Sequence, residues 1–382
     1  MLEQLVALRK EIHRFPELSG KEYDTAQRIV NFLTPFEPDQ IITELGTTGV
    51  AAVYDFGQPK TTIMIRCELD ALPIQEINSF EYRSTYDSVS HKCGHDGHMV
   101  IVAGLADWLQ KTSLENARIV LLFQPAEETG EGAPGILADS KFEEIIPDYI
   151  FALHNLPGFP IHQIVTTGSE FTSTVQSVSI SLHGKESHAA EPEKGLNPAL
   201  AIAELINSFE EITNNDVNSD DFTLITPVYS TMGSKDYGVS PANAELHLTV
   251  RTWTPELMTS LMERIKTTAS QTATKHRLDH ELMWFDYFAA TKNDAFCNSV
   301  INESAHKNDM KPVFQKHPFK FGEDFGVFTQ RYPGAMFGLG SGINTPALHN
   351  PDYDFPDEII ETGISMFKEI INTTLQHRKD NS

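Results

Sequence analysis

Short apolar runs alternate with helical periodicity through the first 170 residues, and this alternation constrains the fold more than any other feature of the chain. Apolar residues recur at helical spacing over 2–12 and 26–33, and a further helix is expected around 100–109. Short apolar runs occupy 61–66, 119–123 and 149–153, and the run at 119–123 is continuous. Buried strands are continuous apolar runs, whereas the helices that cover them repeat every 3.6 residues. The sequence therefore predicts an α/β fold, with a mostly parallel sheet sandwiched by helices.

The pattern changes near residue 172. From there it predicts a strand at 178–182, a helix at 197–212, strands at 222–228 and 244–250, a helix at 255–274 and a strand at 281–287. The order β-α-β-β-α-β is that of a ferredoxin-like domain. A chain of 382 residues is long enough for two domains. We expect a first domain built from 1–171 and 290–382, with a small domain, 172–289, inserted into it.

The chain is acidic, with a formal net charge of −24. Such a charge is repelled by nucleic-acid phosphates and by anionic membranes, so neither is an expected partner. The three cysteines, at 67, 93 and 297, do not form a CxxC pair, which argues against a disulfide framework. The N-terminus lacks the pattern of a signal peptide, and we find no apolar run long enough for a transmembrane helix. We expect a cytoplasmic protein.

Metal-binding residue types gather at 91–98, His-Lys-Cys-Gly-His-Asp-Gly-His. Thiolate and imidazole are preferred zinc ligands, and imidazole also suits other first-row metals. The two glycines allow the backbone to turn so that several side chains converge. We expect Asp96 to orient one of the ligating imidazoles.

Two adjacent carboxylates, Glu127 and Glu128, follow the apolar run at 119–123. If this segment is extended, neighbouring side chains point to opposite sides. One carboxylate then binds metal while the other faces the reacting water. Such pairs are also common on solvated surfaces, so the pair alone is weak evidence.

Three further residues lie near the ends of apolar runs or after a glycine-rich stretch: Asp70, His154 and His349. A single histidine is more often structural than a ligand, and Asp70 also suits a turn before Pro73. Because ligands bind beyond the carboxyl ends of parallel strands, we expect these residues to join the segments above. Together they offer enough N, O and S donors for a two-metal site.

At this point the sequence resembles the family of metal-dependent amidohydrolases and carboxypeptidases that includes hippurate hydrolase, aminoacylases, plant auxin-conjugate hydrolases and N-acetyldiaminopimelate deacetylase. The resemblance spans nearly the whole chain. It rests on the segments 9–18, 93–98, 124–128, 154–158, 188–190 and 323–325, together with His349. The string Cys-Gly-His-Asp-Gly-His at 93–98 is specific for this branch.

The resemblance implies a role for each site residue. The metal ligands would be Cys93, His95, Glu128, His154 and His349. Glu127 would be the general base, and Asp70 the supporting carboxylate. The inserted domain would serve as a lid and as the surface of a homodimer. From it, His188 would stabilise the oxyanion across the dimer interface, and Arg251 would bind the substrate carboxylate.

The chain departs from the family pattern at three places. The family has aspartate two residues before Asp70, where this chain has Glu68. The usual Gly-Gly before the lid histidine is Glu186-Ser187, and the usual Asn-Val-Ile-Pro is Gly238-Val239-Ser240-Pro241. The ligands and the base are intact, so these departures affect substrate identity more than reaction type.

The expected reaction is hydrolysis of the amide bond of an N-acyl amino acid. Two divalent ions, zinc, manganese or cobalt, would activate water, from which Glu127 takes a proton. Two alternatives are a dipeptidase or carboxypeptidase with the same site, and a metal-binding protein that has lost catalysis. Retention of Glu127 and Asp70 argues against the second.

Overall fold

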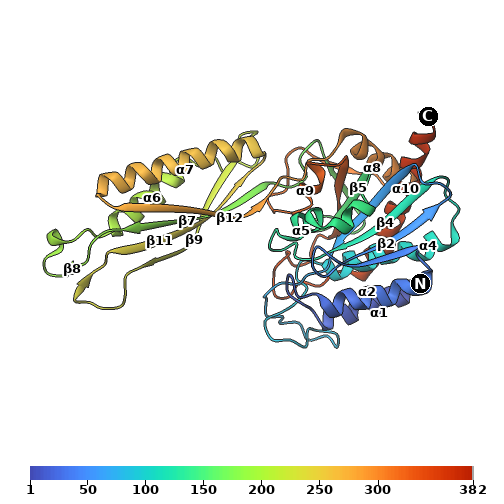
Figure 1. Ribbon diagram of the computed structural model, residues 1–382, viewed down its shortest axis with the longest axis horizontal. Coiled ribbons are helices and arrows are strands. Elements are labelled where there is room, and N and C mark those ends of the chain that lie inside the picture. The colour runs from blue at the N-terminus through green and yellow to red at the C-terminus, as the bar shows by residue number, and fades with distance from the viewer. Residues whose placement is uncertain (381–382) are drawn as a thin grey trace. The chain divides into compact units, whose positions relative to one another are not determined.

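The computed structural model describes residues 1–380, which divide into two compact units (Figure 1). Unit 1 comprises Met1–Phe171, Thr291–Lys316 and the chain from Glu323 onward. Unit 2 comprises Thr172–Ala290 and His317–Gly322. The short piece His317–Gly322 is distant in sequence from the rest of unit 2, so sequence periodicity does not place it there.

Unit 1 is built on an eight-stranded sheet of order β1-β2-β4-β3-β5-β14-β6-β13. The strand bounds are Gln40–Leu45 (β1), Gly49–Phe56 (β2), Thr61–Glu68 (β3), Ala117–Gln124 (β4), Tyr149–Pro157 (β5), Ile164–Thr167 (β6), Val313–Gln315 (β13) and Gly334–Gly342 (β14). The central strands β4, β3, β5 and β14 are mutually parallel, which confirms the expected mostly parallel central sheet. The antiparallel hairpin of β1 and β2 at one edge was not predicted.

Helices cover both faces of this sheet. The larger layer shares one apolar core with side chains such as Ile65 and Phe123. It consists of α1 (Leu2–Arg14), α2 (Tyr23–Leu33), α3 (His95–Ala103), α4 (Leu105–Lys111), α8 (Ala295–Lys307) and α10 (Ile360–Asp380). The strand residues between these, such as Met64 and Leu122, are buried on the opposite face. There α5 (Gly132–Ala138) contacts β4, and α9 (Gly326–Thr329) contacts β14.

The single helix expected around 100–109 is in fact two, α3 and α4, which meet at Gly104. A Cβ at Gly104 would lie 2.5 Å from Ile364 Cδ1 and 2.9 Å from Leu5 Cδ1. The close packing of α1 and α10 at this point leaves little room for a side chain, and glycine, which fits there, is a poor helix former. The apolar pattern continues across the break between α3 and α4, so the pattern gives no sign of the break.

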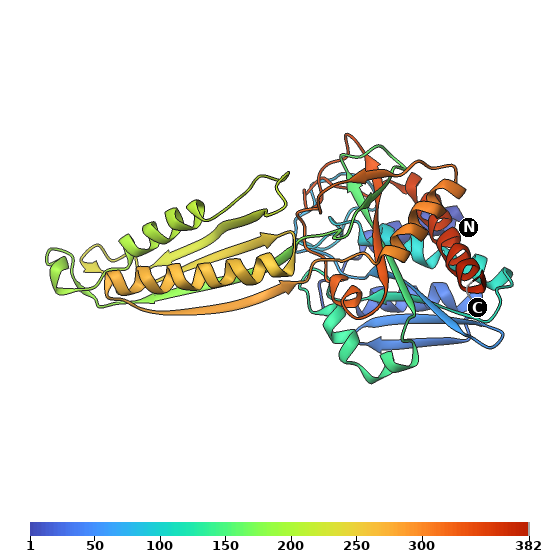
Figure 2. The ribbon, with the colours of Figure 1, turned by 90° about the horizontal axis from the view of Figure 1, so that it is seen from above.

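Unit 2 contains a four-stranded antiparallel sheet of order β12-β7-β11-β9. In chain order the elements are β7 (Thr174–His183), α6 (Ala199–Glu211), β9 (Thr223–Met232), β11 (Asn243–Thr252), α7 (Pro255–His276) and β12 (Asp279–Phe288). Figure 2 shows α6 and α7 together over this sheet. Their apolar residues, among them Leu205 and Leu261, form a core with the alternate strand residues Val178, Ile180 and Leu182.

A small ribbon also belongs to unit 2. It pairs β8 (Ser187–His188) with β10 (Val239–Ser240). Four short 3-10 helices, Thr34–Phe36, Ser140–Glu144, Pro192–Lys194 and Asp357–Ile359, complete the elements of the described chain. Within residues 1–380, no helix combines the length and the apolar character of a membrane span.

Candidate metal centre

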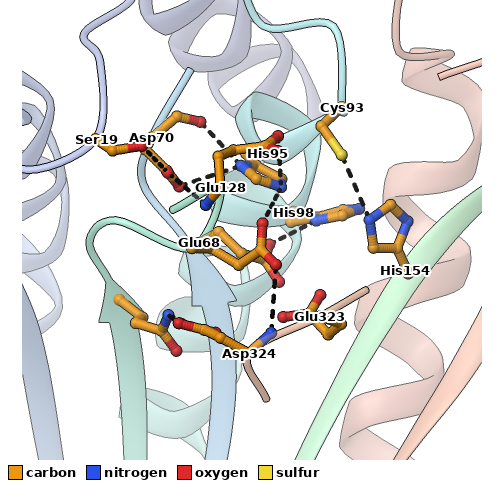
Figure 3. A network of polar contacts seen from close by, with 12 residues as sticks. Ser19, Glu68, Asp70, Cys93, His95, His98, Glu128, His154, Glu323 and Asp324 are labelled. Atoms are coloured by element: carbon orange, nitrogen blue, oxygen red, sulfur yellow. Dashed lines mark hydrogen bonds and ion pairs between the residues drawn. The ribbon is translucent and has the colours of Figure 1, made fainter. Parts of the chain in front are cut away.

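The predicted site residues of unit 1 converge at the carboxyl ends of its central strands. Asp70 follows β3, the pair Glu127 and Glu128 follows β4, and His154 lies near the end of β5. His95 is the first residue of α3. Four segments that are far apart in the sequence thus meet where open α/β sheets bind their ligands (Figure 3).

The ring nitrogens of His95 and His154 have distinct partners. His95 Nδ1 lies 2.8 Å from the backbone oxygen of Asp70, and His154 Nδ1 lies 2.9 Å from that of Asn155. A carbonyl only accepts, so each Nδ1 donates its proton, and in the neutral ring, the form that binds metal, the lone pair lies on Nε2. His154 Nε2 faces the Cys93 sulfur at 3.6 Å. Both imidazoles are therefore oriented as metal ligands are.

The ligating atoms cluster closely enough to share ions. Atoms of Cys93, His95 and His154 lie within 4.8 Å of one another, as do those of Cys93, Glu128 and His349. His95 Nε2 and Glu128 Oε1 are buried without a hydrogen-bond partner. Buried polar atoms without partners are costly, and a cation bound between them would satisfy both. The donor set of thiol, imidazole and carboxylate suits a first-row divalent ion.

The segment that carries Glu127 and Glu128 is a turn, so the expectation of an extended tail is wrong. Ala126 adopts φ +51°, in the left-handed region, and reverses the chain directly after β4. One oxygen of each glutamate consequently lies 3.9 Å from His95 Nε2. The two carboxylates differ in their second contacts. Glu127 accepts the backbone N–H of Asp324 at 3.4 Å, whereas Glu128 Oε1 lies 3.8 Å from His349 Nε2.

Burial dominates the protonation of these groups. It raises the pKa of Glu127 well above its usual value, with a further contribution from Glu323 and then Glu128. It raises the pKa of Glu128 to about 7 and that of Cys93 well above the usual thiol value. It lowers the pKa of His154 to about 3, so this imidazole is neutral and able to bind metal. A divalent cation favours the ionised thiol and carboxylate and so opposes the first three shifts.

A buried arginine beside the carboxylates was not predicted from the sequence. Arg66, in β3, is fully buried and bonds Glu68, Glu323 and Asp324, the last two at 3.0 and 2.7 Å. Asp324 in turn donates its N–H to Glu127. The sequence signal that could have identified it is a charged residue at the end of an apolar strand. A buried arginine requires acidic partners, so its position indicates carboxylates nearby.

Glu68 extends the contacts of Arg66 to the histidine at position 98. One of its oxygens bonds Arg66 and the other lies 2.7 Å from His98 Nδ1. His98 Nε2 lies 2.6 Å from Asn155 Oδ1, so both ring nitrogens of His98 are engaged within the protein. His98 is therefore a neighbour of the ligand cluster whose contacts tie α3 to β3 and β5.

The expectation that Asp96 orients a ligating imidazole is wrong. The Asp96 carboxylate points away from the ligands and bonds α1, through His13 Nδ1 at 2.8 Å and Arg9 at 3.3 Å. At the start of α3, successive side chains are rotated by about 100°, so Asp96 and His95 face different neighbours. It is the carbonyl of Asp70 that orients His95.

The two predicted residues of unit 2 lie on different elements. His188 is exposed in β8, and its Nδ1 accepts the N–H of Ala190 at 3.0 Å. Its strand partner is Val239, so two of the segments that depart from the family pattern are neighbours. Arg251, in β11, is partly buried and donates to the backbone oxygen of Lys320 at 2.6 Å.

The sequence matches known proteins along most of its length. The family model described as peptidase family M20/M25/M40 matches residues 64–373. N-acetyldiaminopimelate deacetylase of Bacillus subtilis is 28% identical over 363 residues, covering 95% of this chain and 96% of that one. N-acetyl-L-cysteine deacetylase of Bacillus subtilis is 30% identical over 341 residues, covering 89% and 80%.

Solved structures agree with these matches. The Bacillus subtilis YXEP protein, described as a dinuclear metal binding peptidase from the M20 family, superposes with a TM-score of 0.85 at 26% identity, covering 98% of both chains. A putative aminohydrolase of Staphylococcus aureus shares the fold, with a TM-score of 0.87 at 20% identity over 97% of this chain and 96% of that one. The expectation of a metal-dependent hydrolase of amide bonds is thus confirmed. As its sequence resemblance implied, the chain belongs to peptidase family M20/M25/M40.

Proposed function

We propose that this protein hydrolyses the amide bond of N-acyl amino acids, releasing a carboxylate and a free amino acid. The observation that carries the proposal is the buried donor cluster around His95, whose unpartnered Nε2 faces Glu127 and Glu128. The relatives named above are deacetylases of N-acetylated amino acids. An acetyl group is therefore the first acyl group to test.

We propose Cys93, His95, Glu128, His154 and His349 as the ligands of two divalent ions. Zinc, manganese and cobalt all suit this donor set. When bound, such ions lower the pKa of water and polarise the amide carbonyl. Asp70 supports the set, because its carbonyl fixes the His95 tautomer and its carboxylate accepts the N–H of Glu128 at 2.9 Å.

Glu127 is the proposed general base. It takes a proton from the attacking water and returns it to the leaving nitrogen. Burial raises the pKa of Glu127 most, and the negative charges of Glu323 and Asp324 raise it further. A raised pKa helps Glu127 to hold the proton between these two steps. Arg66 balances the negative charge of those two acids.

Unit 2 is proposed to act as a ferredoxin-like lid and as the surface of a homodimer. His188 would donate a hydrogen bond to the oxyanion from the partner subunit. Arg251 would bind the substrate carboxylate, since a guanidinium matches a carboxylate in shape and charge. One of its donors is already used by Lys320, which leaves the others for a substrate.

The test is hydrolysis of a panel of substrates by purified protein loaded with manganese, zinc or cobalt. The panel contains N-acetyl and N-benzoyl amino acids together with dipeptides, and Glu127→Gln protein serves as the control for contaminating hydrolases. We expect N-acyl amino acids to be cleaved, with loss of activity in chelator. Preferential cleavage of dipeptides would favour a peptidase, and no cleavage by any metal form would reject the proposal.

A further inference from the structure

Glu22 is a buried acid that contacts the loop of the proposed base. It lies just before α2, and its side chain is fully buried. Its Oε1 accepts the N–H of Gly20 at 2.7 Å and that of Ala126 at 2.9 Å. Its Oε2 accepts the hydroxyl of Thr48 at 2.6 Å. All three donors are neutral, and burying a carboxylate among neutral groups costs free energy.

Ala126 is held in an unfavourable backbone conformation. Its φ of +51° lies in the left-handed region, which is unfavourable for any L-residue other than glycine. The N–H of Ala126 bonds Glu22, and its carbonyl accepts the N–H of Gly132 at 3.0 Å. These contacts hold the turn that directs Glu127 and Glu128 toward the same nitrogen of His95. An extended backbone would separate the two carboxylates.

A second contact fixes the other side of Glu127. The N–H of Glu128 bonds Asp70 Oδ2, which also accepts the hydroxyl of Ser19 at 2.7 Å (Figure 3). Carboxylates thus hold the backbone immediately before and immediately after Glu127. Ser19 and Glu22 belong to the same short connection between α1 and α2.

We infer that Glu22 is a positioning residue for Glu127, which acts by holding Ala126 in its left-handed conformation. The inference rests on the proposed role of Glu127 as base. Misplacing a catalytic group by about 1 Å is enough to lower a rate by about 100-fold. Glu22 therefore contributes to turnover without contacting substrate.

Glu17 provides a matched control on the same connection. It too is a glutamate that accepts neutral donors, the N–H and hydroxyl of Thr25 at 2.7 and 2.8 Å. Both of these contacts are made with the first turn of α2 and stabilise the start of that helix. Loss of either glutamate should lower thermal stability, whereas only Glu22 bonds the loop after β4.

The first measurement compares Glu22→Met with Glu17→Met by amide hydrogen exchange of the metal-loaded protein. Methionine keeps the length of the side chain and removes both carboxylate oxygens, whereas a glutamine oxygen would still accept the N–H of Ala126. We expect faster exchange over 126–128 in Glu22→Met and faster exchange at the start of α2 in Glu17→Met. Hydrogen exchange reports the contact between Glu22 and Ala126 independently of the substrate. Unchanged exchange over 126–128 in Glu22→Met overturns the inference, while failure of the wild-type protein to hydrolyse N-acyl amino acids rejects the proposed function instead.

The second measurement is turnover per metal-loaded chain. Glu22→Met should lower kcat by about 10-fold or more with KM nearly unchanged, since the loss concerns orientation of the base. Glu17→Met should keep kcat within about twofold, because it changes stability and not the orientation of the base. Adding Ala126→Gly to Glu22→Met should restore part of kcat, because glycine adopts positive φ without strain. An equal loss of kcat in both glutamate variants, or no gain from glycine, contradicts the role given to Glu22.

Discussion

His95 Nδ1 lies 2.8 Å from the backbone oxygen of Asp70, and this contact fixes which nitrogen of His95 faces the other donors. With the proton on Nδ1, the lone pair of the neutral ring lies on Nε2, which is 3.9 Å from one oxygen of each of Glu127 and Glu128. The Asp70 carboxylate also lies near this nitrogen, with Oδ1 at 3.4 Å from His95 Nδ1, while its Oδ2 accepts the hydroxyl of Ser19 and the N–H of Glu128. One residue therefore orients a proposed ligand and the turn that carries the proposed base.

This arrangement predicts that the protein binds about two divalent ions per chain and that chelation removes its activity. Metal content after dialysis is measured by elemental analysis, and activity is measured before and after reloading. Bound ions should also raise Tm, since they bind the native state. Full hydrolytic activity in metal-free protein would show that the cluster is not a catalytic metal site.

The two neighbouring glutamates should respond differently to the same substitution. Glu127→Gln should leave metal content near normal and lower kcat by at least about 100-fold, the usual scale for loss of a general base. Glu128→Gln should instead lower metal content, because it removes a proposed ligand. Each variant serves as the control of the other, because both replace a glutamate by glutamine in the same turn. The reverse pattern would exchange the two roles.

The three cysteines provide a matched set for the metal ligands, since all three are buried and free of disulfides. Within residues 1–380, Cys93 is the only cysteine that joins a group of three potential ligands, once with His95 and His154 and once with Glu128 and His349. Cys93→Ser should weaken metal affinity, because a hydroxyl is a poorer ligand than a thiolate. Cys67→Ser and Cys297→Ser should lower stability with affinity unchanged. Equal affinities in competition with a chromogenic chelator would remove Cys93 from the site.

The site residues were predictable from sequence where their placement follows from strand ends. Buried strands are apolar runs, so the sequence alone indicates where β3 and β4 end. The residues just after them could therefore be placed at one edge of the sheet. The density of thiol and imidazole at 93–98 added the chemistry. The element order of unit 2 could be predicted because its strands alternate and its helices are long.

The supporting contacts could not be predicted in the same way. Arg66 and Asp324 are separated by 258 positions, and Glu22 and Ala126 by 104. Periodicity describes which face of an element is apolar, whereas such pairs depend on how distant segments pack. The turn at Ala126 was missed for a further reason, since alanine seldom adopts positive φ and gives no local signal of it.

Stability should depend on pH through His13. Burial alone would lower its pKa, but hydrogen bonds to Asp96 and Glu76 outweigh burial and the opposing charge of Arg9, and raise it from 6.5 to about 9. A folded-state pKa above the unfolded one stabilises the protein fully below about pH 6.5, and this stabilisation is lost as pH rises through about 9. The difference corresponds to about 3 kcal/mol.

The measurement for His13 is urea unfolding of wild type and His13→Gln between pH 6 and about 10, chosen to bracket both pKa values. The difference in free energy of unfolding should be largest at the acid end and shrink as the pH rises. A difference that is constant across this range would mean that folding does not raise the pKa of His13.

The last prediction concerns His188, which is exposed in the ribbon of β8 and β10. His188→Ala should lower kcat by about 100-fold or more, the scale for removal of one oxyanion donor, with metal content unchanged. If His188 acts from the partner subunit, heterodimers of His188→Ala and Glu127→Gln contain one intact site, and mixing the two inactive proteins should restore activity. His183, also an exposed histidine of unit 2, provides the control, and His183→Ala should keep wild-type turnover. Wild-type turnover in His188→Ala would show that this histidine serves only its own domain, through its bond to Ala190. A slow variant that fails to complement Glu127→Gln would instead place its action within one chain.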